Sequence, residues 1–300
     1  MEEFFQHLIN GVSLGSIYAL IALGYTMVYG ILQLINFAHS DVYMVGAFLG
    51  FYTARWLHIS DSPGYGSFFI VLVSAMAGCS LLGYLIERFA YRRLRNAPKI
   101  NSLITAIGMS LFLEYSGQII FGATPQRFPD ILQNGIVFSL GEVRVTTFDA
   151  TIIMTSLCLM FILRHIIQNT KLGKAMRATS YNDKWASLMG IPVDTIISMT
   201  FVIGSALAAA GGILVGMKYP KIEPLMGVMI GLKAFVAAVL GGIGNIAGAV
   251  LGGLIMGLAE EFVVGYLSST YRDALAFGIL IIILLFKPAG LLGKYTVEKV

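Results

Sequence analysis

The sequence has few charged residues. Asp, Glu, Lys and Arg make up 12% of the 300 residues, whereas hydrophobic residues make up 57%. A soluble domain carries about twice this share of charge, and the mean hydropathy here is +0.81. No polar stretch exceeds roughly 30 residues, which leaves no room for a separate soluble domain. We therefore expect one transmembrane domain over residues 1–300, in contact with membrane lipid. The net charge of +4 gives no indication of nucleic-acid binding.

Motifs for chemistry are also lacking. The sequence has no G-x-x-x-x-G-K-[ST] loop for ATP and no G-x-S-x-G nucleophile turn. None of its four histidines has a partner at metal-ligand spacing. These absences predict no catalytic residue, no metal site and no cofactor, so the chain is not expected to be an enzyme. Cys79 and Cys158 both lie in apolar runs, which predicts two buried thiols and no disulfide.

Long apolar runs predict an all-α polytopic membrane protein with eight or nine spans. They cover residues 9–35, 42–57, 67–87, 101–121, 149–163, 195–217, 227–267 and 273–287. A single helix over 227–267 would be about 60 Å long, so this run should fold back on itself. The acidic start MEEFFQHLI precedes an apolar run that is too long for a secretory leader, which predicts no cleavable signal peptide.

Two of the spans are interrupted by polar or glycine-rich residues. The stretch 33–41 leaves no room for a proper loop, and Gly241-Gly242-Ile243-Gly244-Asn245 divides the run 227–267. Broken or re-entrant helices in both halves of a transporter indicate a solute path, although glycine-rich helices also occur purely for packing. The candidate residues of a translocation path are Asn36, His39, Asp41, Gly241, Gly242, Gly244 and Asn245.

Ionisable residues at membrane depth are functional candidates, because burying them is costly unless they are paired or line water. Ser40 or Asp41 also suits a simpler role as the cap of the next helix. Glu114 is expected to pair with Lys233 or with a backbone donor. Glu260 and Glu261 are expected near the outer interface, in contact with solvent.

Two polar segments complete the chain. An outer loop, 122–148, contains an alternating run at 136–146 that predicts a small β-hairpin. The loop 164–194 holds five cations, and basic loops stay in the cytoplasm. Parity then places the N-terminus outside. Apolar residues recur at helical spacing in 164–194, which predicts an amphipathic helix that docks a partner. The alternative is a solvated basic loop that only fixes topology.

Four blocks of the sequence together resemble the LivH-type permeases of high-affinity branched-chain amino acid ABC importers. They are LGSIYALIALGYTMVYGILQLINFAHSDVYMVGA, LGKAMRATSYNDKWASLMGI, GLKAFVAAVLGGIGNIAGAVLGGLIMGLAE and FKPAGLLG, in this order and over almost the whole chain. The resemblance implies an ABC importer permease fold in the bacterial inner membrane. It also implies ATP-driven alternating access, a LivM-like second permease, two ATPase subunits and a periplasmic amino-acid-binding protein.

The loop 164–194 then corresponds to the segment that couples the permease to its ATPases. Its matching residues are Leu172, Gly173, Ala175, Arg177, Ala178 and Gly190. The chain departs from the family at Ser40-Asp41, where Gly-Glu is usual, and at Asn245 and Ala247. Other amino acids, urea or short amides are therefore alternative solutes. From the residues alone, a proton-coupled secondary transporter using His39, Asp41 or Glu114 and a passive channel are the rival functions.

Overall fold

The computed structural model describes residues 2–95, 97–141 and 143–293, and most of these residues are helical. Seven helices in this part are long and apolar enough to cross a membrane. They are α1 (Glu2–Leu32), α3 (Tyr65–Ile86, continued by helical turns to Leu94), α4 (Lys99–Phe121), α5 (Thr147–Asn169), α8 (Val193–Lys218), α10 (Ile246–Tyr266) and α11 (Arg272–Phe286). Two further helices of the bundle are α2 (His39–Trp56) and the shorter α9 (Met226–Gly241). The predicted all-α, multi-pass fold with broken helices is confirmed, and these nine helices correspond to the predicted apolar runs.

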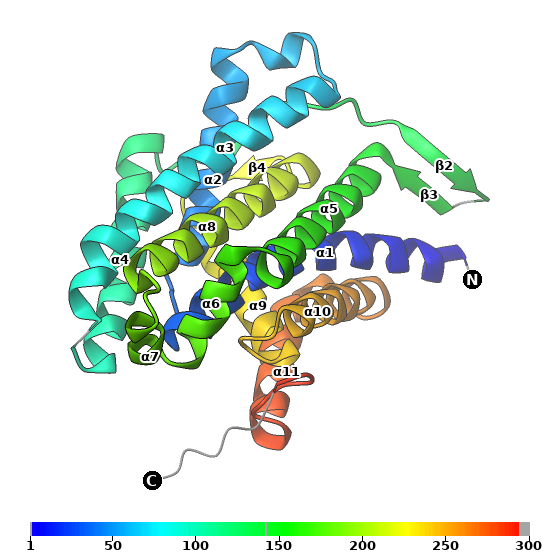
Figure 1. Ribbon diagram of the computed structural model, residues 1–300. Coiled ribbons are helices and arrows are strands. Elements are labelled where there is room, and N and C mark those ends of the chain that lie inside the picture. The colour runs from blue at the N-terminus through cyan, green and yellow to red at the C-terminus, as the bar shows by residue number, and fades with distance from the viewer. Residues whose placement is uncertain (1, 96, 142, 294–300) are drawn as a thin grey trace.

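Helix α1 lies at the centre of the bundle, beside α8, α9 and α10 (Figure 1). In the most apolar part of α1, 94% of the residues are buried, against 11% for α11. Small residues allow this close packing, as at Gly15 and Gly257, where the backbones of α1 and α10 touch. The outer helices expose large apolar side chains such as Ile119, Phe161 and Leu285. Such a surface suits a lipid environment.

The bundle has two distinct ends. At one end the hairpin β2 (Ile136–Leu140) and β3 (Val143–Thr146) lies beside the N-terminal residues, where Gln6 Nε2 donates to the Arg144 carbonyl at 3.2 Å. At the other end Arg92 lies 3.1 Å from Asp194, which joins the basic turn after α3 to the start of α8. The hairpin is confirmed, and the N-terminus and the loop 164–194 lie at opposite ends as predicted. Which end faces the cytoplasm stays a prediction.

A second strand pair was not expected from the sequence. The short strands β1 (Gln126–Arg127) and β4 (Lys221–Ile222) pair antiparallel, with Gln126 opposite Ile222. They tie the loop 122–148 to the connection between α8 and α9. Each of these strands has only two residues, which is too short to show the alternation of apolar and polar residues that predicts a strand.

Two local predictions were wrong. Cys79 is buried, but Cys158 is exposed on α5, because it lies on the face of that helix that is turned away from the bundle. Neither Ser40 nor Asp41 caps α2: the helix begins one residue before Ser40, with Ala38 at the cap position and no capping side chain. Both residues lie within the first turn and are buried.

Candidate functional site

The first helix break separates α1 from α2 at residues 33–38. Gln33 has a left-handed backbone (φ 53°), which ends α1, and the chain then turns inward. Asn36 is buried and accepts a hydrogen bond from Tyr91 Oη at 2.7 Å. The Asn36 carbonyl in turn accepts from the His39 amide at 3.1 Å. Polar backbone is thus held inside the bundle, where neighbouring protein covers it.

The start of α2 forms a buried polar cluster, which contains the predicted path residues His39 and Asp41. The His39 ring packs on Tyr25, with centroids 4.7 Å apart, and His39 Nε2 has no hydrogen-bond partner within the described part of the chain. Asp41 accepts from Ser110 Oγ of α4 at 2.5 Å. Its other oxygen, Oδ1, is buried and unpartnered among residues 2–95, 97–141 and 143–293. Buried polar atoms without partners are costly, so the two in this cluster are candidates for contact with a passing solute.

Helix α9 approaches this cluster closely because two glycines in its first turns, Gly227 and Gly231, face Ser40. A Cβ atom on Gly227 would lie 2.5 Å from the Ser40 carbonyl oxygen, and one on Gly231 would collide with the Ser40 side chain. Helices α1, α2, α4 and α9 therefore all contribute to the surroundings of residues 39–41. Sequence reasoning did not identify the contribution of Ser110, which lies in an ordinary apolar run.

The second helix break, between α9 and α10, is closed by backbone contacts. Gly242 and Gly244 have φ of +101° and +92°, a region that favours glycine. The Asn245 side chain caps α10 by accepting from the Gly248 amide at 3.2 Å, and its Nδ2 donates to the Leu292 carbonyl at 2.8 Å. The Leu292 amide also donates to the Gly241 carbonyl at 3.0 Å. The sequence blocks GGIGN and KPAGLLG thus pack against each other, a contact that sequence spacing alone does not predict.

The two breaks come together around a small hollow of about 10 Å³. Its walls come from α1, from both breaks and from α9: Tyr25, Tyr29, Ile35, Phe235, Ala238 and Ile243. A volume of this size holds at most about one water molecule. The structure therefore brings the flanks of both breaks together with little space between them. His39 lies beside Tyr25, and Asp41 lies beside α4.

An ion cluster around Lys233 corrects three expectations. Lys233 Nζ lies 3.1 Å from Glu260 Oε1 and 2.7 Å from Asp273 Oδ1, so its partner is not Glu114. Glu260 is only 1% exposed and also accepts from Tyr18 Oη at 2.8 Å. The Glu261 side chain lies 3.7 Å from His7 and is 12% exposed. Neither glutamate is solvated, because α10 turns both toward neighbouring helices.

We expect Lys233→Met to destabilise the protein. It leaves the buried Glu260 with Arg272, 2.9 Å away, as its remaining cationic contact. Weakening the pairing of a buried charge costs about 1–3 kcal/mol, which would lower the apparent melting temperature in detergent. Lys221→Met is the matched control, because the Lys221 side chain is 67% exposed. Equal melting temperatures for the two variants would contradict this expectation.

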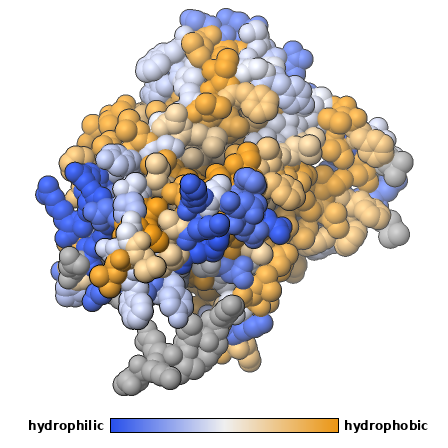
Figure 2. Space-filling model, in the orientation of Figure 1, coloured by the Kyte–Doolittle hydropathy of each residue, from blue (hydrophilic) through white to orange (hydrophobic). Residues whose placement is uncertain are grey.

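The loop 164–194 contains two helices where one was expected. Helix α6 (Lys171–Tyr181) is capped by Thr170 and α7 (Asp183–Leu188) by Asn182. On α6, Met176 is buried against the bundle, and Ser180 Oγ donates to the Gly30 carbonyl near the end of α1 at 2.6 Å. Figure 2 shows hydrophilic residues gathered over α6. The amphipathic character was predicted correctly, and the segment is folded against the bundle.

The outer surface of these two helices carries apolar side chains, which we name the apolar patch. It consists of Tyr181, Trp185, Leu188 and Met189, which are 94%, 72%, 85% and 83% exposed. The last three are spaced so that they share one face of α7. Large apolar groups exposed together indicate an interaction surface.

The sequence-predicted residues of this segment divide between two surfaces. Leu172, Gly173 and Ala175 are buried or half-buried against the bundle. Arg177 and Ala178 are exposed, and Arg177 Nη1 donates to the Ile167 carbonyl at the end of α5. Gly190, also exposed, has φ +82°.

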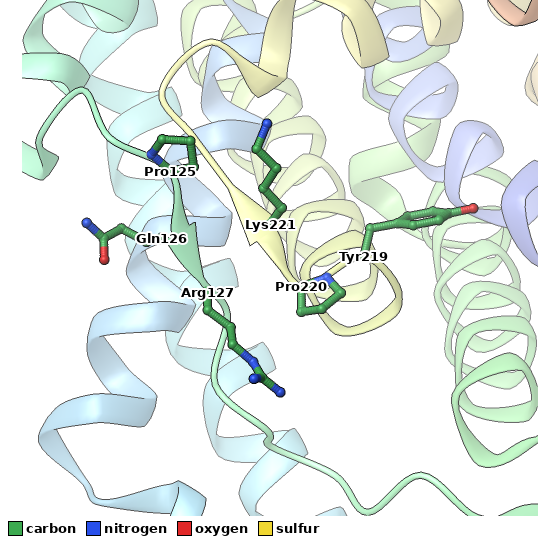
Figure 3. A pocket seen from close by; sticks show the side chains of 6 residues that line it. All are labelled: Pro125, Gln126, Arg127, Tyr219, Pro220 and Lys221. Atoms are coloured by element: carbon green, nitrogen blue, oxygen red, sulfur yellow. The ribbon is translucent and has the colours of Figure 1, made fainter. Parts of the chain in front are cut away.

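A second hollow lies at the opposite end, on the strand pair β1–β4. It measures about 590 Å³ and is lined by Pro125, Gln126, Arg127, Tyr219, Pro220 and Lys221. In Figure 3 the Tyr219 ring points away from Gln126 and Arg127. The side chains of Arg127 and Lys221 are largely exposed. The hollow is a surface feature and contains none of the predicted path residues.

Comparison with known proteins covers almost the whole chain. The family described as the permease component of branched-chain amino acid transport systems matches residues 7–284. The high-affinity branched-chain amino acid transport system permease protein BraD of Pseudomonas aeruginosa is 44% identical over 305 residues, which cover 99% of this chain and 98% of that protein. The corresponding protein LivH of Escherichia coli K12 is 44% identical over 301 residues, with the same coverage.

One more distant relative and one solved structure also match most of the chain. The probable branched-chain amino acid transport permease protein LivH of Methanocaldococcus jannaschii is 30% identical over 294 residues and covers 91% of this chain and 88% of its own. Among solved structures, PsaBC from Streptococcus pneumoniae in complex with Fab superimposes with a TM-score of 0.47 at 12% identity. It covers 96% of this chain and 93% of that one.

Proposed function

Because the chain belongs to the family of permease components of branched-chain amino acid transport systems, we propose that it carries leucine, isoleucine or valine across the bacterial inner membrane as the permease subunit of an ABC importer. The observation that carries this proposal is the 44% identity to BraD and LivH over 99% of the chain. The matched region covers 99% of this chain and 98% of each of those permeases, so it includes nearly all of the spans, both breaks and the segment 164–194 of this chain.

The proposed path runs along the interface of the broken helices. The closed hollow between the breaks and the polar cluster at His39 and Asp41 are its candidate parts. A transporter that alternates between two openings must close such a path in between. The small size of the hollow, about 10 Å³, fits such a closed state. The unpartnered Asp41 Oδ1 suits an ammonium group of a passing amino acid.

The proposed partners follow from the two ends of the bundle. Two ATPase subunits would dock at the end that carries α6 and α7, and they would hydrolyse ATP for a chain that has no nucleotide-binding loop of its own. A periplasmic binding protein would deliver the solute at the opposite end, near β1–β4 and the loop 122–148. A LivM-like second permease would lie beside the exposed apolar helices. Movement at α6 reaches α1 directly, through the Ser180–Gly30 hydrogen bond of 2.6 Å.

Purification from native membranes and uptake into vesicles test the proposal together. We expect ATPase subunits and a second permease to co-purify with the chain, and leucine uptake to require ATP inside right-side-out vesicles. Excess isoleucine or valine should compete. Uptake by the isolated chain that follows a proton gradient and ignores ATP would refute the importer function. Competition by urea or short amides alone would refute the solute assignment.

We expect Arg177→Glu to reduce ATP-dependent uptake. The change removes the hydrogen bond to the Ile167 carbonyl and reverses the charge of an exposed side chain on α6. Losing an exposed hydrogen bond and reversing one charge on the docking face together cost at least about 1.4 kcal/mol, so uptake should fall at least about tenfold while the membrane helices stay folded. The measurement is uptake per amount of inserted protein, together with recovery of ATPase subunits. Normal values for both would exclude Arg177 from the coupling surface.

A further inference from the structure

A π-helical turn interrupts the helix that continues α3. Helix α3 is followed without a loop by η2 (Glu87–Tyr91), a π turn, and then by η3 (Arg92–Leu94), a 3₁₀ turn. Such π turns are rare and occur frequently at functional sites. In η2 the wider turn directs both of its terminal side chains inward, and Glu87 and Tyr91 are 0% and 3% exposed. These two side chains make contacts in different directions.

The Glu87 side chain fixes η2 to helix α8. Its carboxylate accepts a hydrogen bond from Ser198 Oγ at 2.5 Å and forms an ion pair with Arg95. Arg95 and Arg92 also pair with Asp194, which lies in the first turn of α8. Asp194 is the last residue of the segment 164–194 and comes six residues after the end of α7 at Leu188. The turn η2 is therefore attached to the end of that segment by charged groups.

The Tyr91 side chain reaches the first helix break. Its hydroxyl donates to Asn36 Oδ1 at 2.7 Å, and its ring packs on Phe201 of α8 with centroids 5.3 Å apart. The Asn36 carbonyl accepts a hydrogen bond from the backbone amide of His39, and His39 is the first residue of α2. A continuous series of contacts thus joins Asp194 at the end of the bundle to the polar cluster at the start of α2.

A purely structural role explains this arrangement poorly. Apolar residues of similar size would pack as stably as the Glu87–Arg95 pair, because burying charges consumes most of their mutual attraction. Charged and hydrogen-bonded contacts have defined geometry, and they can switch between discrete arrangements when an attached helix shifts. The described contacts place such a set between the two regions that must move together in an ATP-driven permease.

We infer that η2 transmits the motion of the segment 164–194 to the first helix break. Tyr91 acts as a positioning residue for Asn36, and the Glu87–Arg95–Asp194 cluster holds η2 to the first turn of α8. This inference rests on the proposed importer function. It assigns a role in coupling to Glu87, Tyr91 and Arg95, which lie outside both the segment 164–194 and the proposed path.

The test uses the complete transporter in proteoliposomes, with its ATPase subunits, second permease and binding protein. Tyr91→Phe keeps the ring that packs on Phe201 but removes the donor to Asn36. Asp194→Asn removes the charge of a side chain that is 61% exposed, so it has little effect on stability. For both variants we expect ATP hydrolysis to continue while the number of leucine molecules moved per ATP falls about tenfold, the effect of losing about 1.4 kcal/mol of coupling.

Controls separate coupling from folding. Tyr84→Phe makes the same chemical change on the exposed face of α3 and should leave the ratio of uptake to hydrolysis unchanged. Asp194→Glu should restore most of the ratio, since it restores the charge. In a double-mutant cycle, Asp194→Asn added to Tyr91→Phe should cause little further loss, because both changes interrupt the same series of contacts.

Different outcomes refute different claims. A wild-type complex that shows no ATP-dependent leucine uptake would refute the proposed function. If the wild-type complex transports leucine and Tyr91→Phe has the same ratio of uptake to hydrolysis, the inference about η2 is wrong and the importer function stands. Additive losses in the double variant would mean that Tyr91 and Asp194 act independently, which also overturns the inference.

Discussion

Leu188→Asp should abolish ATP-dependent uptake and release the ATPase subunits, while the membrane helices stay folded. Leu188 lies in the apolar patch on α7 and is 85% exposed, so its replacement removes no contact within the chain's core. When a partner covers it, an apolar side chain of this size contributes about 1.5–3 kcal/mol. An aspartate in the same place must lose its hydration without a paired cation. The two effects together should lower ATPase affinity by at least about a hundredfold.

The measurement is the amount of ATPase recovered with the purified permease, followed by uptake in vesicles. Leu188→Met keeps an apolar side chain and should bind the ATPases normally. Ser187→Asp adds the same charge on a neighbouring face of α7 and should have a smaller effect. Full ATPase recovery with Leu188→Asp would show that the apolar patch is not the docking surface. A loss of inserted protein would instead point to a role of Leu188 in folding.

Much of the fold could be predicted from the sequence because a membrane imposes simple rules. Apolar runs must be helices of membrane length, and cations gather at one end. The run 227–267 was correctly expected to fold back, and the hairpin followed from alternation at 136–146. The β1–β4 pair was missed, because two residues carry no periodicity. Cys158 was placed wrongly because an apolar helix can face lipid as readily as it faces the core.

The candidate site was harder to predict, since its contacts join distant parts of the chain. Asn36, His39 and Asp41 were singled out as polar residues in an apolar setting, and all three are buried. Their partners Tyr91 and Ser110 gave no signal, because a tyrosine or serine in a helix has many neutral roles. Lys233 was paired with the wrong carboxylate: charge complementarity permits several partners, and only packing selects Glu260 and Asp273.

The second helix break was predicted from its glycine residues, and the packing observed there leads to a prediction about Gly241. Gly241→Leu should prevent the bundle from assembling. A Cβ atom at Gly241 would collide with the backbone carbonyl of Gly248, and backbone cannot move aside as a flexible side chain can. The same turn is held by the Leu292 amide on the Gly241 carbonyl at 3.0 Å, so separating α9 from α10 would also break that hydrogen bond. Overpacking a core costs about 1–3 kcal/mol even where side chains can adjust.

The variant should therefore show a much lower yield of inserted, folded protein and no uptake. The control is Gly278→Leu on α11, where an added Cβ atom meets nothing within 4 Å and where leucine favours the helix more than glycine does. Melting in detergent and the yield of inserted protein distinguish the two variants. If Gly241→Leu is as stable as Gly278→Leu yet transports nothing, then α9 and α10 separate without cost in the resting protein. In that case α9 and α10 would move relative to each other during transport, and their contact at the break would not be needed for folding.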